Sequence, residues 1–254
     1  ILGIYTGLLG YVGAKTGLSL DLLSQRAFGE KGSYLPSAMT SFTQIGWFGV
    51  GSFVSGGTAT PNFARFAKNG KSGAITTVVA FFIGNSLMFF FGAVSSIFVG
   101  GNDIFEVMVR LNLFYLAVLV LGLNIWTTND NALYTAGLGL ANIFHQRKKP
   151  MVLLSGIIGT VASVWLYYNF CGWLNILNCT LPPVGMILVL AYFMNKEDFE
   201  TDQPKLKTID WFAVAGVILG AIVANLLHWG IASINGMVVA AVCYCVGQAV
   251  NKRK

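Results

Sequence analysis

The sequence has 254 residues, of which 55% are hydrophobic and only 10% are charged, and its mean hydropathy is +0.68. These values exclude an ordinary soluble enzyme and favour a single integral membrane domain over residues 1–254, because no polar stretch is as long as a domain. The net charge of +6 does not indicate nucleic-acid binding, since the basic residues form short clusters between apolar segments, as loops of membrane proteins do.

Apolar runs separated by polar loops predict an all-α polytopic membrane protein, because each spanning helix needs roughly 20 apolar residues. The run at 1–14 is too short for a full span and is typical of the end of one. In chain order we then expect a polar loop (16–31), an apolar run rich in Gly and Ser (33–60), a strong span (74–99), a short interfacial piece (103–110), helices at 111–142, 151–170, 173–194, 211–228 and 231–250, and a charged loop at 196–207.

The basic clusters predict which loops share one side of the membrane. Pairs of crossings separate the clusters at 65–71, 147–149, 196–207 and 252–254, so these four are expected on the cytoplasmic side. The first loop, with Lys15, Arg26 and Lys31, belongs there too, yet only one crossing fits between it and Arg65. Two explanations compete: residues 33–60 form two half-helices that enter and return, or spans are missing from this chain. We favour missing sequence.

The most informative residues are Asn124, Thr127, Thr128 and Asn131, which recur at i, i+3, i+4 and i+7 and therefore share one helix face. Lipid would leave these side chains without hydrogen-bond partners, so the stripe is expected to face a bundle interior or a watery cavity. An interhelical hydrogen-bond stripe is the alternative to a binding site. Asp130 points off this face, and we expect it to pair with a basic loop residue.

Two further groups of residues are candidates for ligand contacts. Gln44 and Trp47 lie at i, i+3, where an amide can bond the edge of a heterocycle and an indole can stack on it. Ser52, Phe53 and Ser55 lie in the Gly-rich stretch 51–57, which favours unwound backbone lining a cavity. The alternatives are a packing Trp and a close contact between helices. Pro182 and Pro183 are expected to kink their helix, for packing more than for gating.

Several stretches together resemble the cytosine permeases of the nucleobase–cation symporter family. The most specific is the run Gly-Leu-Asn-Ile-Trp-Thr-Thr-Asn-Asp-Asn-Ala-Leu-Tyr at 122–134, and the others are at 13–17, 44–50, 51–58 and 84–88. The resemblance implies two inverted five-helix repeats and twelve spans, with helices 1 and 6 broken at mid-membrane. On that pattern this chain lacks helix 1, helices 4 and 5 and parts of helices 2, 3 and 6, with a jump near residues 50–51.

The resemblance also implies roles for the candidate residues. The base is expected to stack between Trp47 and Phe53, with Gln44, Ser52, Ser55 and the Asn124 side chain at its polar edge. A coupling Na⁺ is expected on the Asn124 carbonyl and the Thr127 and Thr128 hydroxyls, together with carbonyls of helix 1. Oxygen donors of this kind suit a hard cation.

The function implied is Na⁺-coupled uptake of cytosine by alternating access in the bacterial inner membrane. We expect a lipid-embedded monomer with no organic cofactor and no nucleic-acid partner. The alternative is a proton-coupled transporter of another nucleobase or related heterocycle, such as a purine, uracil or a hydantoin. A channel is disfavoured because no filter repeat or ring of like charge appears. An intramembrane enzyme is disfavoured because no nucleophile–base pair or metal motif appears.

Overall fold

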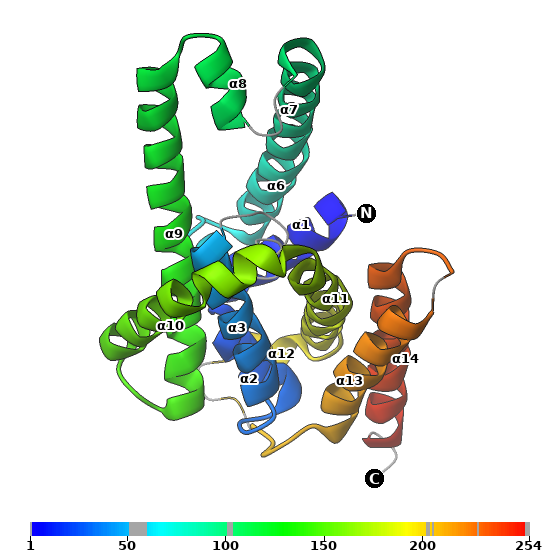
Figure 1. Cartoon of the computed structure of the whole chain (residues 1–254). Coiled ribbons are helices and arrows are strands. Elements are labelled where there is room, and N and C mark those ends of the chain that lie inside the picture. Colours follow the sequence, from blue (N-terminus) through cyan, green and yellow to red (C-terminus); the bar gives the residue numbers. More distant parts are fainter. Residues whose placement is uncertain are drawn as a thin grey trace.

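The computed structural model describes residues 2–50, 60–100, 104–201, 204, 206–227 and 229–251, and every regular element in these ranges is helical (Figure 1). The elements are α1 (Leu2–Thr16), α2 (Leu20–Phe28), α3 (Tyr34–Val50), α5 (Pro61–Ala64), α6 (Gly70–Val79), the π-helical turn η1 (Ala80–Gly84), α7 (Asn85–Val99), α8 (Ile104–Arg110), α9 (Phe114–Phe144), α10 (Lys148–Tyr168), α11 (Phe170–Met194), α12 (Lys196–Glu200), α13 (Trp211–Leu226) and α14 (Ala232–Asn251).

Four described segments are long and apolar enough to cross a membrane: Gly70–Val99, Lys148–Leu166, Phe170–Met194 and Ala232–Val250. A shorter apolar helix covers Trp211–Leu226. The 31-residue helix α9 is not among these segments, because the polar stripe in its middle lowers its hydropathy. These helices confirm the prediction of an all-α polytopic membrane protein.

The main apolar core lies where α1 and α2 meet α11, α13 and α14. Leu9 of α1, Leu23 of α2, Leu188 of α11 and Val217 of α13 are among its buried members. In contrast, α7 and the first half of α9 rise away from this body, joined at their far ends through α8 (Figure 1). Their large apolar side chains are exposed, as expected of surfaces that face lipid or further helices.

The two prolines of α11 lie inside a continuous helix and at a contact with the hairpin of α13 and α14. Pro182 has no N–H to donate to the carbonyl of Asn178, and the Ser233 hydroxyl of α14 donates to that carbonyl at 3.2 Å instead. A Cβ added at Gly220 or Gly236 would lie 3.2 or 3.1 Å from the Pro183 ring. This environment favours the packing interpretation of the proline pair.

The prediction of a plain loop at 16–31 was wrong, because α2 occupies most of it. The Ser19 side chain caps the helix by accepting from the amide of Leu22, and Gly29 ends it with a φ of 85°. Leu20, Leu23 and Phe28 are buried on one face of α2, so this polar-looking segment is amphipathic.

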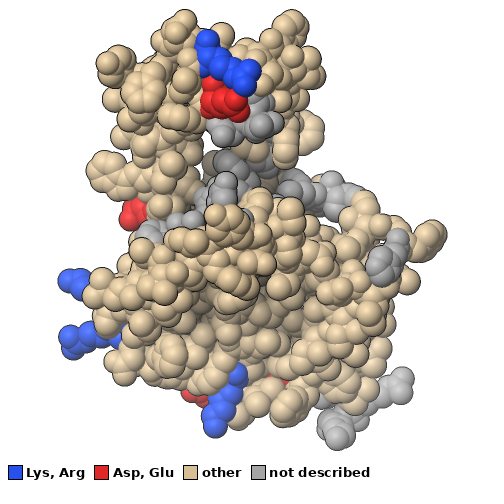
Figure 2. All heavy atoms as spheres, in the orientation of Figure 1, with Lys and Arg blue, Asp and Glu red and all other residues tan. Residues whose placement is uncertain are grey.

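Contacts between basic loops support the prediction that these loops lie on the same side of the membrane. The amide of Glu30 donates to the carbonyl of Lys207 at 2.7 Å. Arg26 donates to the carbonyl of Asp198 at 2.7 Å, and the ring centroids of Tyr34 and His145 lie 5.8 Å apart. The first basic loop therefore meets the loop at 196–207, and the start of α3 meets His145 at the end of α9. Figure 2 shows charged side chains at the top, along the left flank and at the lower edge of this face, on an otherwise uncharged surface.

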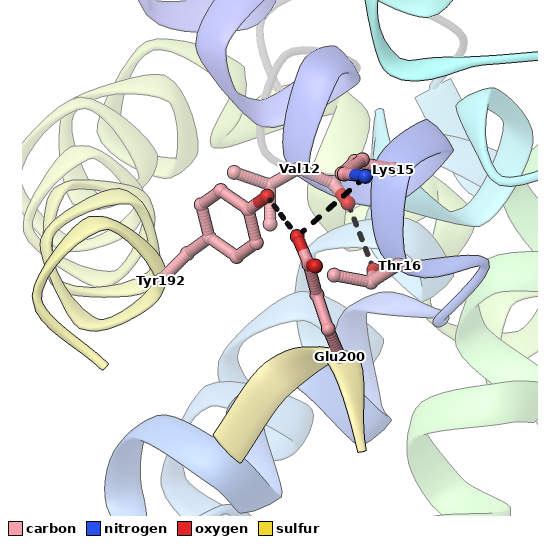
Figure 3. A network of polar contacts seen from close by, with 5 residues as sticks. All are labelled: Val12, Lys15, Thr16, Tyr192 and Glu200. Atoms are coloured by element: carbon pink, nitrogen blue, oxygen red, sulfur yellow. Dashed lines mark hydrogen bonds and ion pairs between the residues drawn. The ribbon is translucent and has the colours of Figure 1, made fainter. Parts of the chain in front are cut away.

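The short helix α12 is fastened to α1 and α11 by the network in Figure 3. Tyr192 of α11 donates to the Glu200 carboxylate at 2.9 Å, and the Lys15 ammonium of α1 lies 3.9 Å from the same oxygen. Thr16, beside Lys15, bonds back to the carbonyl of Val12 at 2.8 Å. The charged loop predicted at 196–207 is therefore partly an ordered helix.

Candidate functional site

The candidate site lies along α9 where this helix packs against α3. Small residues permit the close approach: a Cβ added at Gly139 would lie 2.1 Å from the Ser41 hydroxyl and 2.9 Å from the Ser37 carbonyl. The Ser41 hydroxyl donates to the carbonyl of Ala136 at 3.2 Å. Helices that approach through Gly and Ser in this way hold a fixed register.

This register determines which candidate residues of α3 and α9 lie at the same height. Ser37 bonds Asn142, and Ser41 bonds Ala136, so the two helices run antiparallel. Continuing the register places Gln44 near the level of Thr135, and the backbone of Trp47 near the level of Asn131. The stripe residue opposite the predicted α3 pair is therefore Asn131, about two helical turns from Asn124.

The stripe predicted on α9 is present on one face of an unbroken helix. Asn124, Thr127 and Asn131 are exposed and Thr128 is half-buried, whereas Gln44 of α3 is buried. This exposure leaves the stripe free to meet a ligand or a further helix, so the binding site and the interhelical hydrogen-bond stripe both stay open.

Two of the three expected cation ligands already lie side by side. The Thr127 hydroxyl lies 3.0 Å from the Asn124 carbonyl oxygen and 3.1 Å from that of Leu123, and donates to both. Thr residues elsewhere in the chain, such as Thr77 and Thr160, make the same bond to their own helix, so this contact leaves the expected cation site a prediction. A cation held here would need further oxygen donors from another element, as the expectation of helix 1 carbonyls requires.

Several predicted residues cannot be placed. The Trp47 side chain and the whole of Ser52, Phe53 and Ser55 lie outside the described residues, as does the far side of the jump expected near 50–51. Their roles at the base remain predictions.

A cavity of about 400 Å³ opens beside the lower end of the stripe. Its lining includes Asp130, Asn131 and Tyr134 of α9, Lys148 of α10 and Phe63 of α5. It shares only Asn131 with the stripe, so it opens at the level of Asn131, which is also the level of the Trp47 backbone. The expected ion pair of Asp130 is not formed with any described Lys or Arg, although Lys148 lines the same cavity.

Two basic side chains near this cavity contact Tyr134. The Lys148 ammonium lies 3.4 Å from the centre of the Tyr134 ring, a cation–π contact. The Arg65 guanidinium donates a hydrogen bond to the Tyr134 hydroxyl. Arg65 follows α5, so this contact ties α5 to α9 just below the stripe.

A polar cluster that the sequence did not predict lies at the C-terminal end of α9, which is its lower end in Figure 1. Asn142 donates to the Ser37 hydroxyl at 2.8 Å, and Ser37 donates to the Asp21 carboxylate at 2.6 Å. Gln25 donates to the Asn142 carbonyl at 2.6 Å. The available signal was periodicity: Asn142 follows Asn124 by 18 residues, which is five turns, so the two share one face.

Asp21 is the ionisable member of this cluster and is only 5% exposed. It lies in α2, outside the membrane-spanning segments. Burial is the main cause that raises its pKa from 3.8 to about 6, against the lowering effects of the Ser37 hydrogen bond, the backbone amide and the Arg65 charge.

The sequence matches a family of known proteins. A family model described as "Permease for cytosine/purines, uracil, thiamine, allantoin" matches residues 1–59 and again 50–250. The second match restarts where a jump in the sequence was expected, and the jump itself remains a prediction.

The chain is also similar to curated cytosine permeases from three Escherichia coli strains, K12, O6:H1 and O157:H7. Each is 36% identical over 347 residues, covering 100% of this chain and 82% of the relative. The aligned length exceeds the 254 residues of the chain, so stretches of these relatives have no counterpart in it.

Proposed function

The chain belongs to the family of permeases for cytosine/purines, uracil, thiamine and allantoin, and from this premise we propose that the intact protein takes up cytosine together with Na⁺. Members of this family are transporters and not enzymes. The protein is a multi-pass membrane protein, and we place it in the bacterial inner membrane as a monomer.

The observation that carries the proposal is the face of α9 that holds the exposed Asn124 and Thr127 and the half-buried Thr128. The Thr127 hydroxyl donates to the Asn124 backbone oxygen at 3.0 Å, and both are neutral oxygens that a small cation could take as ligands if the hydroxyl proton turned away. The Asn124 side chain remains available to a neutral heterocycle, because a carboxamide both donates and accepts hydrogen bonds. One residue would therefore contact both the cation and the base.

The roles of the other residues follow from this arrangement. We assign the base to a slot between Trp47 and Phe53, with Gln44, Ser52 and Ser55 at its polar edge. Cation binding fixes the backbone around Asn124 and thereby orients its side chain for the base. Alternating access then exposes the loaded site to one side of the membrane at a time.

The coupling must be reciprocal: Na⁺ raises the affinity for the base by the same factor by which the base raises the affinity for Na⁺. The alternative function, proton-coupled transport of another nucleobase or heterocycle, would show dependence on pH in place of Na⁺. A channel would conduct without saturable base binding.

A binding screen tests the proposal directly. Nucleobases and hydantoins would be titrated against the purified intact protein in NaCl and in choline chloride at fixed ionic strength. We expect cytosine to bind best, with an affinity higher in Na⁺ by about 5- to 150-fold, the usual range of coupling between sites. Equal affinities in both salts would refute Na⁺ coupling, and a preference for a different heterocycle would refute cytosine as the substrate.

A further inference from the structure

We propose that Asp21 is a proton-binding site that controls the docking of α2 on α3 and α9. Neutral Asp21 holds the three helices together, and ionised Asp21 favours their separation and hydration. The inference goes beyond the proposed transport function and is tested without substrate, so either can fail alone.

The geometry of docking is a ring of hydrogen bonds that starts and ends on α2. Gln25 donates to the Asn142 carbonyl at 2.6 Å, Asn142 donates to the Ser37 hydroxyl at 2.8 Å, and Ser37 donates to Asp21 at 2.6 Å. Gln25 and Asp21 lie at i, i+4 and share one face of α2. Every donor points along the ring towards Asp21, so its carboxyl group is the terminal acceptor.

Asn142 also donates to the Ser33 hydroxyl at 3.2 Å, and Ser33 donates to the carbonyl of Glu30 at 2.6 Å. The ring is therefore tied to the turn that joins α2 to α3. Release of α2 would break contacts with both α3 and α9 at once.

Burial of Asp21 favours the neutral form of its carboxyl group and outweighs the Ser37 hydrogen bond, the backbone amide and the Arg65 charge, which favour the charged form. The residue is 5% exposed, and Ser37 is the side chain that donates to it. Three buried polar atoms on α2 or at α5 have no hydrogen-bond partner among the described residues: Ser24 Oγ, Asn62 Nδ2 and Arg65 Nε. Asn62 accepts from the amide of Leu20, beside Asp21, so water that enters on separation would reach unsatisfied groups.

The charged groups around α2 are few and lie at different ends of the helix. From α5, Arg65 acts on Asp21 and favours its charged form. From α3 and α9 the facing groups are the neutral Ser37 and Asn142. Two acidic residues meet the other end of α2 through their backbones: the carbonyl of Asp198 accepts from Arg26, and the amide of Asp210 donates to the carbonyl of Phe28. The contacts with α11 belong to the apolar core.

The sign of the pH dependence follows from linkage. Docked Asp21 has a pKa of about 6, and hydrated Asp21 would return towards 3.8. The docked state therefore binds the proton more tightly, by a factor of about 100. Docking is strongest below pH 3.8, weakens as the pH rises from 3.8 to 6, and stays at its weaker level above 6. Acidification would tighten the lower end of α9, which carries the candidate site on the same face.

Hydrogen exchange of the intact protein in lipid nanodiscs tests this. Protection of the amides at 20–28 and 138–145, corrected for intrinsic rates, would be followed from pH 4 to 7.5. We expect protection in the wild type to fall by up to about 100-fold over this range, mostly below pH 6. In Asp21→Asn, which mimics the neutral acid, protection should stay high at every pH.

Asp210→Asn is the matched control, because Asp210 is also 5% exposed and its side chain caps α13. It should retain the wild-type pH dependence. Arg65→Gln should move the midpoint upward, since Arg65 lowers the pKa of Asp21. If Asp21→Asn fails to fold, the pH dependence of hydrogen exchange in the wild type and in Arg65→Gln still tests the proposal. Protection that is independent of pH in the wild type, or pH dependence that survives in Asp21→Asn, overturns the proposal.

Discussion

Replacing Thr128 with Ala is expected to abolish the stimulation of cytosine binding by Na⁺ in the intact protein. The hydroxyl is one of only three oxygens that α9 is expected to offer the cation, and it is half-buried on the stripe. Its loss would remove a ligand without changing the shape of the helix. The ratio of cytosine affinities in Na⁺ and choline should fall from about 5–150 towards one, measured by calorimetry or a radioligand assay.

Two companion variants separate this effect from general damage. Asn124→Ala removes the side chain but keeps the backbone carbonyl, so base affinity should fall by about 10- to 100-fold while Na⁺ still binds. Thr160→Ala is the matched control on α10, because Thr160 is an exposed Thr that bonds only its own helix, at Gly156. Full Na⁺ dependence in Thr128→Ala would show that the cation site is elsewhere.

Replacing Gly139 with Val is expected to separate α3 from α9 and to lower the stability of the whole helical bundle. Even the Cβ would lie 2.1 Å from the Ser41 hydroxyl and 2.9 Å from the Ser37 carbonyl, and backbone cannot turn aside as a flexible side chain can. Overpacking of this kind costs about 1–3 kcal/mol. The midpoint of thermal unfolding should fall by about 5–10 °C.

Gly156→Ala on α10 is the control for the glycine substitution. A Cβ there would meet only the Leu133 side chain, at 3.6 Å, which is ordinary van der Waals contact. Its unfolding midpoint should stay unchanged or rise slightly, because Ala favours helix over Gly. Equal midpoints for Gly139→Val and the wild type would mean that α3 and α9 do not pack as described.

The sequence predicted the membrane helices well, because apolar length and turn-by-turn periodicity are local properties of the chain. Helix α9 was expected at 111–142 and lies at Phe114–Phe144. Helix α2 was not predicted, because its polar residues hide an amphipathic pattern in which Leu20, Leu23 and Phe28 share one buried face. The cap at Ser19 and the glycine at position 29 were the available signals.

The site was only partly predictable. A stripe such as Asn124 to Asn131 can be found from spacing within one helix. The ring at Asp21 depends on residues more than 100 positions apart, such as Ser37 and Asn142, and no local pattern gives the register between two helices. The register between α3 and α9 places Asn131 at the level of the Trp47 backbone. Only this register makes Asn131 a candidate for a ligand contact.

The continuity of α9 has a mechanical consequence. About 27 Å separate Asn124 from Asn142 along an unbroken helix, so the two ends form a rigid lever. A tilt of about 10° around the lower end would carry the stripe sideways by about 5 Å, whereas a binding site tolerates errors of only about 0.5 Å. A small change of tilt at the C-terminal end of α9 would therefore be enough to form or break a set of ligand contacts at the stripe.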